Sequence, residues 1–226
     1  MAGAEGGISP ESIPQLQRQK ATVLLLGPGL GGTAQSAARA AETRVLVQRL
    51  LPGFAGSAVL DADGLNAAAQ LLAEGKVLPH PTGELILTPH PGEMARLTGL
   101  SVAEISADRE KIAQQYAKKW NVVVALKGSR TIVAAPDGRA CVNPTGNPGL
   151  ARGGSGDVLT GVIGALLAQG MEPVKAAVYG AMLHGRAGAL AQEKLGEYSM
   201  NAGDIIDGLP GAFMEADGAI RANADC

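Results

Sequence analysis

The segment of residues 147–161 places one carboxylate among glycines, immediately before an apolar helical pattern. Three of the four residues at 153–156 are glycines, which removes Cβ atoms where the backbone approaches a ligand or adopts an unusual φ. Residues 158–167 predict a helix, so the N–H groups and the positive dipole end of its first turn should face outward together. This arrangement is typical of an anion site, with Asp157 inside it. Asp157 could also be an ordinary helix cap, but a cap alone does not require the glycines.

A second candidate anion site is the run Lys127-Gly128-Ser129-Arg130-Thr131, which follows a fully apolar strand pattern. An ammonium, a guanidinium and two hydroxyl groups lie around one glycine, and this set suits recognition of phosphate. The alternative is a plain hairpin turn, and the residues alone favour neither interpretation.

His90 is flanked by two prolines where a strand pattern changes to a helix pattern, and Glu93 follows in the first helical turn. The restricted backbone should hold the imidazole toward the ligand edge, so we expect His90 to contact a ligand. His80, also flanked by prolines, is interpreted as a turn residue, and His184, within an apolar helical stretch, as a packed core residue.

Asp61, Asp63 and Asn66 follow another short apolar run. Their oxygens could coordinate Mg²⁺ or bind substrate hydroxyl groups. They could equally be residues that end a strand and cap a helix.

These side chains need a scaffold that brings them to the same edge of a β-sheet. The sequence predicts strands at 21–26, 58–60, 84–87 and 122–126, and short strands at 131–134 and 140–142. It predicts one helix over 33–50, capped by Thr33, a second helix that ends near residue 75, and a third over 101–120, opened by a capping box at Ser101. Alternating strands and helices followed by hairpins indicate an α/β fold, with a mainly parallel sheet covered on both faces and a small antiparallel addition. Ligands of such sheets bind beyond the carboxyl ends of the strands, where all the polar loops named above lie.

The glycines at 27, 29 and 32 match the G-x-G-x-x-G fingerprint of dinucleotide-binding dehydrogenases. That fingerprint requires an acid about 20 residues onward, whereas Asp61 and Asp63 lie 29 and 31 residues after Gly32. Pro28 within the loop also removes an N–H donor. The nicotinamide dehydrogenase is therefore the weaker interpretation.

The composition is that of one globular domain over residues 1–226, with residues 1–20 expected to lack fixed structure. The formal net charge is −2 and the basic residues are scattered, which argues against nucleic-acid or anionic-membrane partners and favours small molecules. Two cysteines without metal-ligand spacing indicate neither a zinc site nor a disulfide framework. No export signal or membrane span is predicted, and a cytoplasmic location is expected.

Five motifs together resemble the NAD(P)H-hydrate dehydratase family, whose domain is ribokinase-like. They are Gly27-Pro28-Gly29-Leu30-Gly31, Asp61-Ala62-Asp63-Gly64-Leu65-Asn66, Thr88-Pro89-His90-Pro91-Gly92-Glu93, Leu126-Lys127-Gly128, and residues 147–161. Each motif alone is weak, but their order and spacing over residues 23–210 are specific.

The resemblance implies that ADP binds at Lys127, Gly128, Ser129, Arg130, Thr131 and Gly156, and that the hydrated nicotinamide nucleotide contacts Gly31, His90 and Asp157. It implies phosphate transfer from ADP to the hydroxyl group of (S)-NAD(P)H hydrate, followed by elimination that gives NAD(P)H, AMP and phosphate. Asp157 would be the catalytic acid or base, and Mg²⁺ the accompanying ion, with no protein ligand assigned to it. A homo-oligomer, with a tetramer as one form, is also expected.

Two features depart from the family pattern. Arg152 stands where many relatives carry Thr and is expected to tune phosphate contact. Relatives normally begin with a further strand, loop and helix, and this chain reaches the Gly-Pro-Gly loop by residue 27. The sheet is therefore expected to lack strands and to have an edge that a neighbouring subunit covers or that is left exposed. The epimerase domain that often accompanies the dehydratase is not expected either. The alternatives are a catalytically incomplete nucleotide-binding protein and a small-molecule kinase of the same fold.

Overall fold

The computed structural model describes residues 2–3, 6–32 and 36–224, with side chains described as far as Asp217. One sheet runs through these residues in the order β1-β2-β3-β4-β5-β6. Its strands are β1 (Val23–Leu26), β2 (Ser57–Leu60), β3 (Leu85–Leu87), β4 (Val123–Leu126), β5 (Ile132–Ala134) and β6 (Ala140–Val142). The first four are parallel, and β5 and β6 are added antiparallel. The predicted sheet and its antiparallel addition are therefore confirmed.

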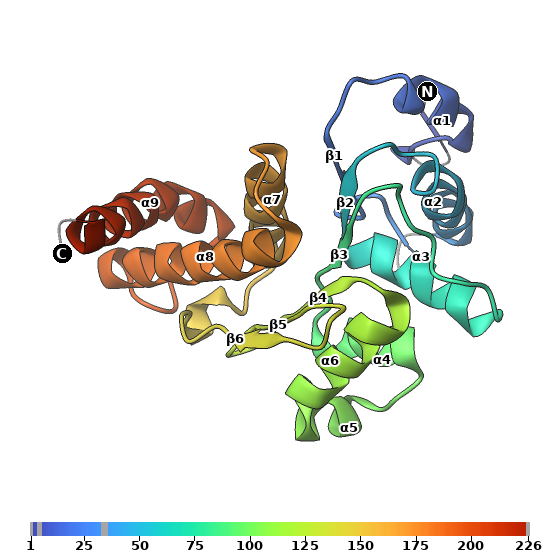
Figure 1. Ribbon diagram of the computed structural model, residues 1–226. Helices are drawn as coiled ribbons and strands as arrows, with labels where there is room; N and C mark the ends of the chain where they lie inside the picture. Colours follow the sequence, from blue (N-terminus) through green and yellow to red (C-terminus); the bar gives the residue numbers. More distant parts are fainter. Residues whose placement is uncertain (1, 4–5, 33–35, 225–226) are drawn as a thin grey trace.

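Helices cover both faces of the sheet (Figure 1). They are α1 (Ile13–Gln17), α2 (Ala37–Leu50), α3 (Ala62–Ala73), α4 (Pro91–Thr98), α5 (Val102–Ala107), α6 (Arg109–Trp120), α7 (Ser155–Ala168), α8 (Pro173–Leu195) and α9 (Ala202–Ala224), with short 3-10 helices η2 (Pro10–Ser12) and η3 (Pro148–Leu150). Figure 1 shows α7, α8 and α9 together on one side of the sheet and α2, α3, α4 and α6 on the other. Among the described residues, no helix is both long and apolar enough to cross a membrane.

Alternation along the strands divides the core into two layers. In β4, Val124 and Leu126 face the layer packed by α2 to α6, whereas Val123 and Ala125 face the layer packed by α7, α8 and α9. All four side chains are buried, as expected for a central strand that is covered on both faces.

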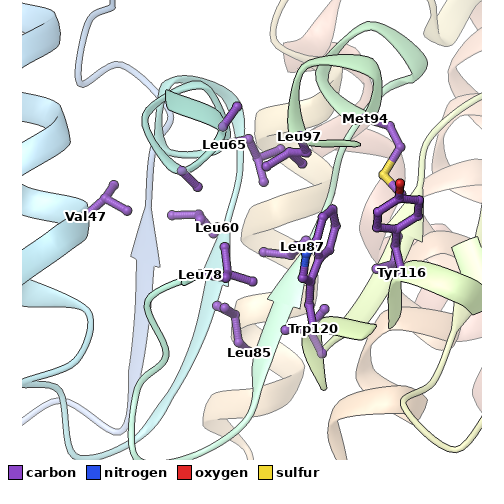
Figure 2. Close-up of a cluster of buried hydrophobic side chains, with 14 of the residues drawn as sticks. Val47, Leu60, Leu65, Leu78, Leu85, Leu87, Met94, Leu97, Tyr116 and Trp120 are labelled. Carbon is purple, nitrogen blue, oxygen red and sulfur yellow. The ribbon is translucent and has the colours of Figure 1, made fainter. Parts of the chain in front are cut away.

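Figure 2 shows the first of these layers, where leucines from β2, β3 and α3 meet Met94 and Leu97 of α4. Tyr116 and Trp120 of α6 close it, with ring centroids 4.7 Å apart. They contribute large rings to a core that otherwise consists mostly of aliphatic side chains.

Helix boundaries differ from the sequence expectation in three places. The helix predicted over 101–120 is two helices, because Asp108 leaves helical geometry at φ −146° and caps α6 by accepting from Lys111 N. The capping box at Ser101 is confirmed. Helix α2 begins at Ala37 with Ser36 as its cap, and the predicted cap Thr33 lies outside the described residues. Helix α7 begins at Ser155, so Asp157 is its third residue.

The β1 edge of the sheet and the N-terminal residues were also the subject of expectations from the sequence. Strand β1 forms one edge in the described part of the chain, and its Leu25 side chain is 43% exposed. Within residues 1–20, for which no fixed structure is expected, η2 and α1 are helical and Ile13 is buried. This segment therefore adds to the core beside α2.

Candidate functional site

A cavity of about 760 Å³ lies beyond the carboxyl ends of β3 and β4, against the first turn of α7 and one side of α8. Its volume is in the range of sites for small molecules and cofactors. Of the predicted site residues, its wall contains His90, Lys127, Gly128, Ser129, Thr131 and Gly156. Gly31, Arg130 and Asp157 are not part of this wall.

An arginine that the sequence analysis did not single out donates hydrogen bonds to the turn after β4. Arg109 Nη2 donates to the carbonyl groups of Leu126 (3.0 Å) and Lys127 (3.2 Å). A Cβ at Gly128 would lie 2.5 Å from the same Nη2 atom, so a larger residue here would require the guanidinium to shift. Burial lowers the pKa of the Arg109 guanidinium. Arg109 therefore supports the turn, while Lys127 presents its side chain to the cavity.

The first turn of α7 forms another part of the wall. Gly154 precedes the helix at φ +86°, a conformation that favours glycine. Ser155 and Gly156 begin the helix and line the cavity. The first turn of a helix leaves its N–H groups without intrahelical partners and carries the positive end of the dipole. The cavity thus combines an anion-binding helix end with the ammonium of Lys127.

His184 lies behind this turn, and its Nε2 is hydrogen-bonded to Ser155 Oγ (3.2 Å). Burial lowers the pKa of His184 to about 4; a hydrogen bond with the backbone of Ser155 opposes this shift and the charge of Lys127 adds to it. The prediction of a buried residue is confirmed, but His184 also lines the cavity. Its bond to Ser155 gives the first turn of α7 a polar support from α8.

His90 caps helix α4 as well as lining the cavity. Its Nδ1 accepts from Gly92 N (3.0 Å) and Glu93 N (3.3 Å), and Glu93 Oε2 accepts in turn from His90 N (2.7 Å). Burial lowers the pKa of His90, and the carboxylate of Glu93 opposes that shift. The neutral ring therefore uses Nδ1 as an acceptor, and its Nε2 lies 3.5 Å from Glu93 Oε1, so both ring nitrogens are near groups of the α4 cap.

The three residues considered for Mg²⁺ are all engaged by other protein groups. Asp61 accepts from Lys127 and from Thr160. Asp63 accepts from Gly31 N (2.9 Å), and Asn66 Oδ1 accepts from Arg96 Nε (2.8 Å).

Within residues 2–3, 6–32 and 36–224, no group of three or more His, Cys, Asp or Glu residues could hold a metal ion. Mg²⁺ usually binds through one or two carboxylates together with substrate phosphates, so this finding concerns only a site built from protein side chains alone.

Asp157 is exposed and lies on a different side of α7 from the cavity. It is at the end of a mainly apolar groove between α7 and α9, with Val158, Leu209 and Phe213 among the lining residues. Gly31, at φ +89°, is tied by its N–H group to α3 through Asp63. The structure thus brings the predicted nucleotide residues other than Arg130 together with His90, and places Arg130, Asp157 and Gly31 outside that wall.

Arg152 lines the cavity but is used locally. Its guanidinium donates to the carbonyl of Tyr198 (2.8 Å), in the turn between α8 and α9. The structure thus shows a loop-fixing contact for the residue that was expected to tune phosphate contact.

Sequence reasoning missed Arg109, Ser155 and Thr160 as parts of the site. Ser155 stands within the glycine-rich segment, which was a usable signal. Arg109 and Thr160 lie inside helical patterns, where a charged face or an isolated hydroxyl carries no local sign of its partner.

Comparison with known proteins agrees with this geometry. The family model described as NAD(P)H-hydrate dehydratase matches residues 7–211. The chain is 49% identical over 207 residues to a bifunctional NAD(P)H-hydrate repair enzyme of Moorella thermoacetica, covering 91% of this chain and 37% of that protein. It is 49% identical over 138 residues to an ADP-dependent (S)-NAD(P)H-hydrate dehydratase of Neisseria meningitidis, covering 61% of this chain and 46% of that protein.

A crystal structure of an ADP/ATP-dependent NAD(P)H-hydrate dehydratase from Bacillus subtilis, co-crystallized with ATP and Mg²⁺ and soaked with CoA, has the same fold. The TM-score is 0.76 at 33% identity, over 88% of this chain and 67% of that one. The chain spans less than half the length of the two curated relatives named above. With a family model that covers most of its residues, the chain belongs to the NAD(P)H-hydrate dehydratase family.

Proposed function

We propose that this chain catalyses the ADP-dependent dehydration of (S)-NAD(P)H hydrate to NAD(P)H, with AMP and phosphate as the other products. The observation that carries the proposal is the cavity in which Lys127, the turn that follows it and Gly156 of α7 meet beside His90. An ammonium beside a helix N-terminus suits the phosphates of a nucleotide. His90 on the same wall suits a second, adjoining ligand.

In the proposed reaction the phosphoryl group passes from ADP to the hydroxyl group of the hydrate, and AMP leaves. The hydroxyl proton goes to Asp157, which we propose as the base. The carbon–oxygen bond then breaks with its electron pair leaving on phosphate, and a neighbouring carbon loses a proton to the departing phosphate, which restores the dihydronicotinamide ring. The first turn of α7 and Lys127 would stabilise the charge on the transferred group. No step is assigned to a protein-held metal ion.

The test is recovery of dihydronicotinamide absorbance from NADH hydrate, with ADP and Mg²⁺ in the buffer and a nucleotide-free control. Recovery that depends on ADP supports the proposal, and Asp157→Asn should abolish it while ADP binding in calorimetry stays within about threefold of the parent. Full turnover by the Asp157→Asn variant would contradict the assigned role of Asp157.

A second candidate is a nucleotide-binding protein without turnover. The observation that favours it is the position of Asp157 on the groove between α7 and α9, away from the cavity wall that holds Lys127. ADP binding without any recovery of absorbance would select this candidate. A panel of sugars and vitamins with ATP would reveal a kinase of the same fold.

The proposal also takes residues 1–226 as one domain that acts in the cytoplasm as a homo-oligomer. The two apolar layers that share one sheet support the single domain. Size-exclusion chromatography with light scattering would give the oligomeric state.

A further inference from the structure

An ion pair connects Lys127, which lines the cavity, to the buried Asp61 at the end of β2. Lys127 Nζ is 2.6 Å from Asp61 Oδ1, and Thr160 Oγ1 donates to the other carboxylate oxygen, Asp61 Oδ2 (2.7 Å). Asp61 and Thr160 are each only 1% exposed. Both oxygens of this carboxylate therefore already have a partner inside the protein.

Stability alone does not explain such a pair, because burying two charges costs about as much as their attraction returns. Lys127 also keeps 18% of its side chain exposed and lines the cavity. A Cβ at Gly156 would lie 3.3 Å from its Nζ, so the ammonium stands directly beside the first turn of α7. The pair therefore holds a positive charge where the helix end also favours an anion.

We propose that Asp61 is a positioning residue, oriented by Thr160, that fixes the ammonium of Lys127 where a phosphate of the bound nucleotide meets the first turn of α7. The inference rests on the proposed function and adds a residue to it. Lysine has a long, flexible stem, and holding it in place before the ligand arrives avoids an entropic cost at binding.

The surroundings of the pair fix its orientation. Glu93 Oε2 is 3.7 Å from Lys127 Nζ, but the same oxygen accepts from the backbone in the cap of α4, so Glu93 is the weaker partner. Thr88 Oγ1 lies 3.5 Å from Thr160 Oγ1 and 3.4 Å from the carbonyl of Leu60. The hydroxyl of Thr160 is thus embedded in a polar chain at the ends of the strands, with Asp61 as its acceptor.

The matched variants are Thr160→Val, which keeps the shape of the side chain and removes the hydroxyl, and Thr160→Ser, which keeps the hydroxyl and removes a methyl group. Calorimetry would measure the affinities for ADP and for adenosine. Loss of a hydrogen bond to a charged group predicts about tenfold weaker ADP binding for Thr160→Val. Thr160→Ser should stay within about twofold of the parent, and adenosine binding should change in neither variant. If Thr160 acts only by packing, the order of the two variants reverses, which would overturn the proposal.

A second readout needs no nucleotide. The rate at which acetic anhydride labels Lys127, relative to the exposed Lys118, can be followed by mass spectrometry. Lys127 should be labelled several-fold more slowly than Lys118 in the parent, faster in Asp61→Asn and Thr160→Val, and at the parent rate in Thr160→Ser.

The two readouts keep this proposal separate from the proposed function. A parent protein that binds no ADP would contradict the function, and the labelling would still decide the role of Asp61. ADP binding by the parent, together with a Lys127 labelling rate that Asp61→Asn leaves unchanged, would overturn the role of Asp61 alone.

Discussion

Replacing His184 by Gln should remove a large part of the acid sensitivity of the fold. His184 is buried and its pKa is lowered from 6.5 to about 4, so the folded chain keeps it neutral where the unfolded chain binds a proton. Stability from this group is complete above pH 6.5 and is lost as the pH falls toward 4. At about 1.4 kcal/mol per pKa unit, the loss is roughly 3 kcal/mol. Gln does not titrate and can still reach Ser155.

The assay is urea unfolding of the parent and of His184→Gln at a series of pH values from 7 to 4. The free energy of unfolding of the parent should fall by roughly 3 kcal/mol more than that of the variant over this range. Burial also lowers the pKa values of His80 and His90, but these residues are present in both proteins and cancel in the difference. Two parallel curves would refute the reasoning, because they would mean that His184 binds protons equally in the folded and unfolded chains.

Glycines supply the other predictions. Gly27→Ala should lower the free energy of unfolding by more than about 3 kcal/mol, since Gly27 has φ +133° and a Cβ would collide with the carbonyl oxygen of Asp61. Gly99→Ala is its control: φ is +77° but nothing lies within 4 Å of the added Cβ, so urea unfolding should show a loss of only about 1 kcal/mol. Equal losses in the two variants would contradict the steric argument. Gly156→Ala should weaken ADP binding several-fold in calorimetry, because its Cβ would lie 3.3 Å from Lys127 Nζ. Its stability should be unchanged or higher, because alanine favours helix by up to about 1 kcal/mol, and unaltered ADP affinity would show that the ammonium adjusts freely.

Much of the scaffold could be predicted from the chain because its signals are local. Short apolar runs predicted the parallel strands, and the capping box at Ser101 correctly marked a helix start. The same logic was available at Asp108, whose carboxylate caps α6, but an uninterrupted helical pattern concealed the break. Local patterns indicate where a helix can begin, but tertiary packing decides whether two adjacent helical segments form one continuous helix.

The site also has features that the sequence predicts and features that depend on tertiary packing. Residue types and spacing alone determined the candidate anion loops at 127–131 and 147–161 and the family to which they belong. The reason is that the charge of a lysine or an aspartate and the missing side chain of a glycine are properties of the residue type. Only the tertiary structure decided that Asp61 bonds Lys127, 66 residues away, and Thr160, 99 residues away, and that His184 supports Ser155. It also placed Asp157 on the groove side of α7. The physical reason is that a buried polar group must find a partner in the folded core, and which partner is within 3 Å depends on how the sheet and helices pack.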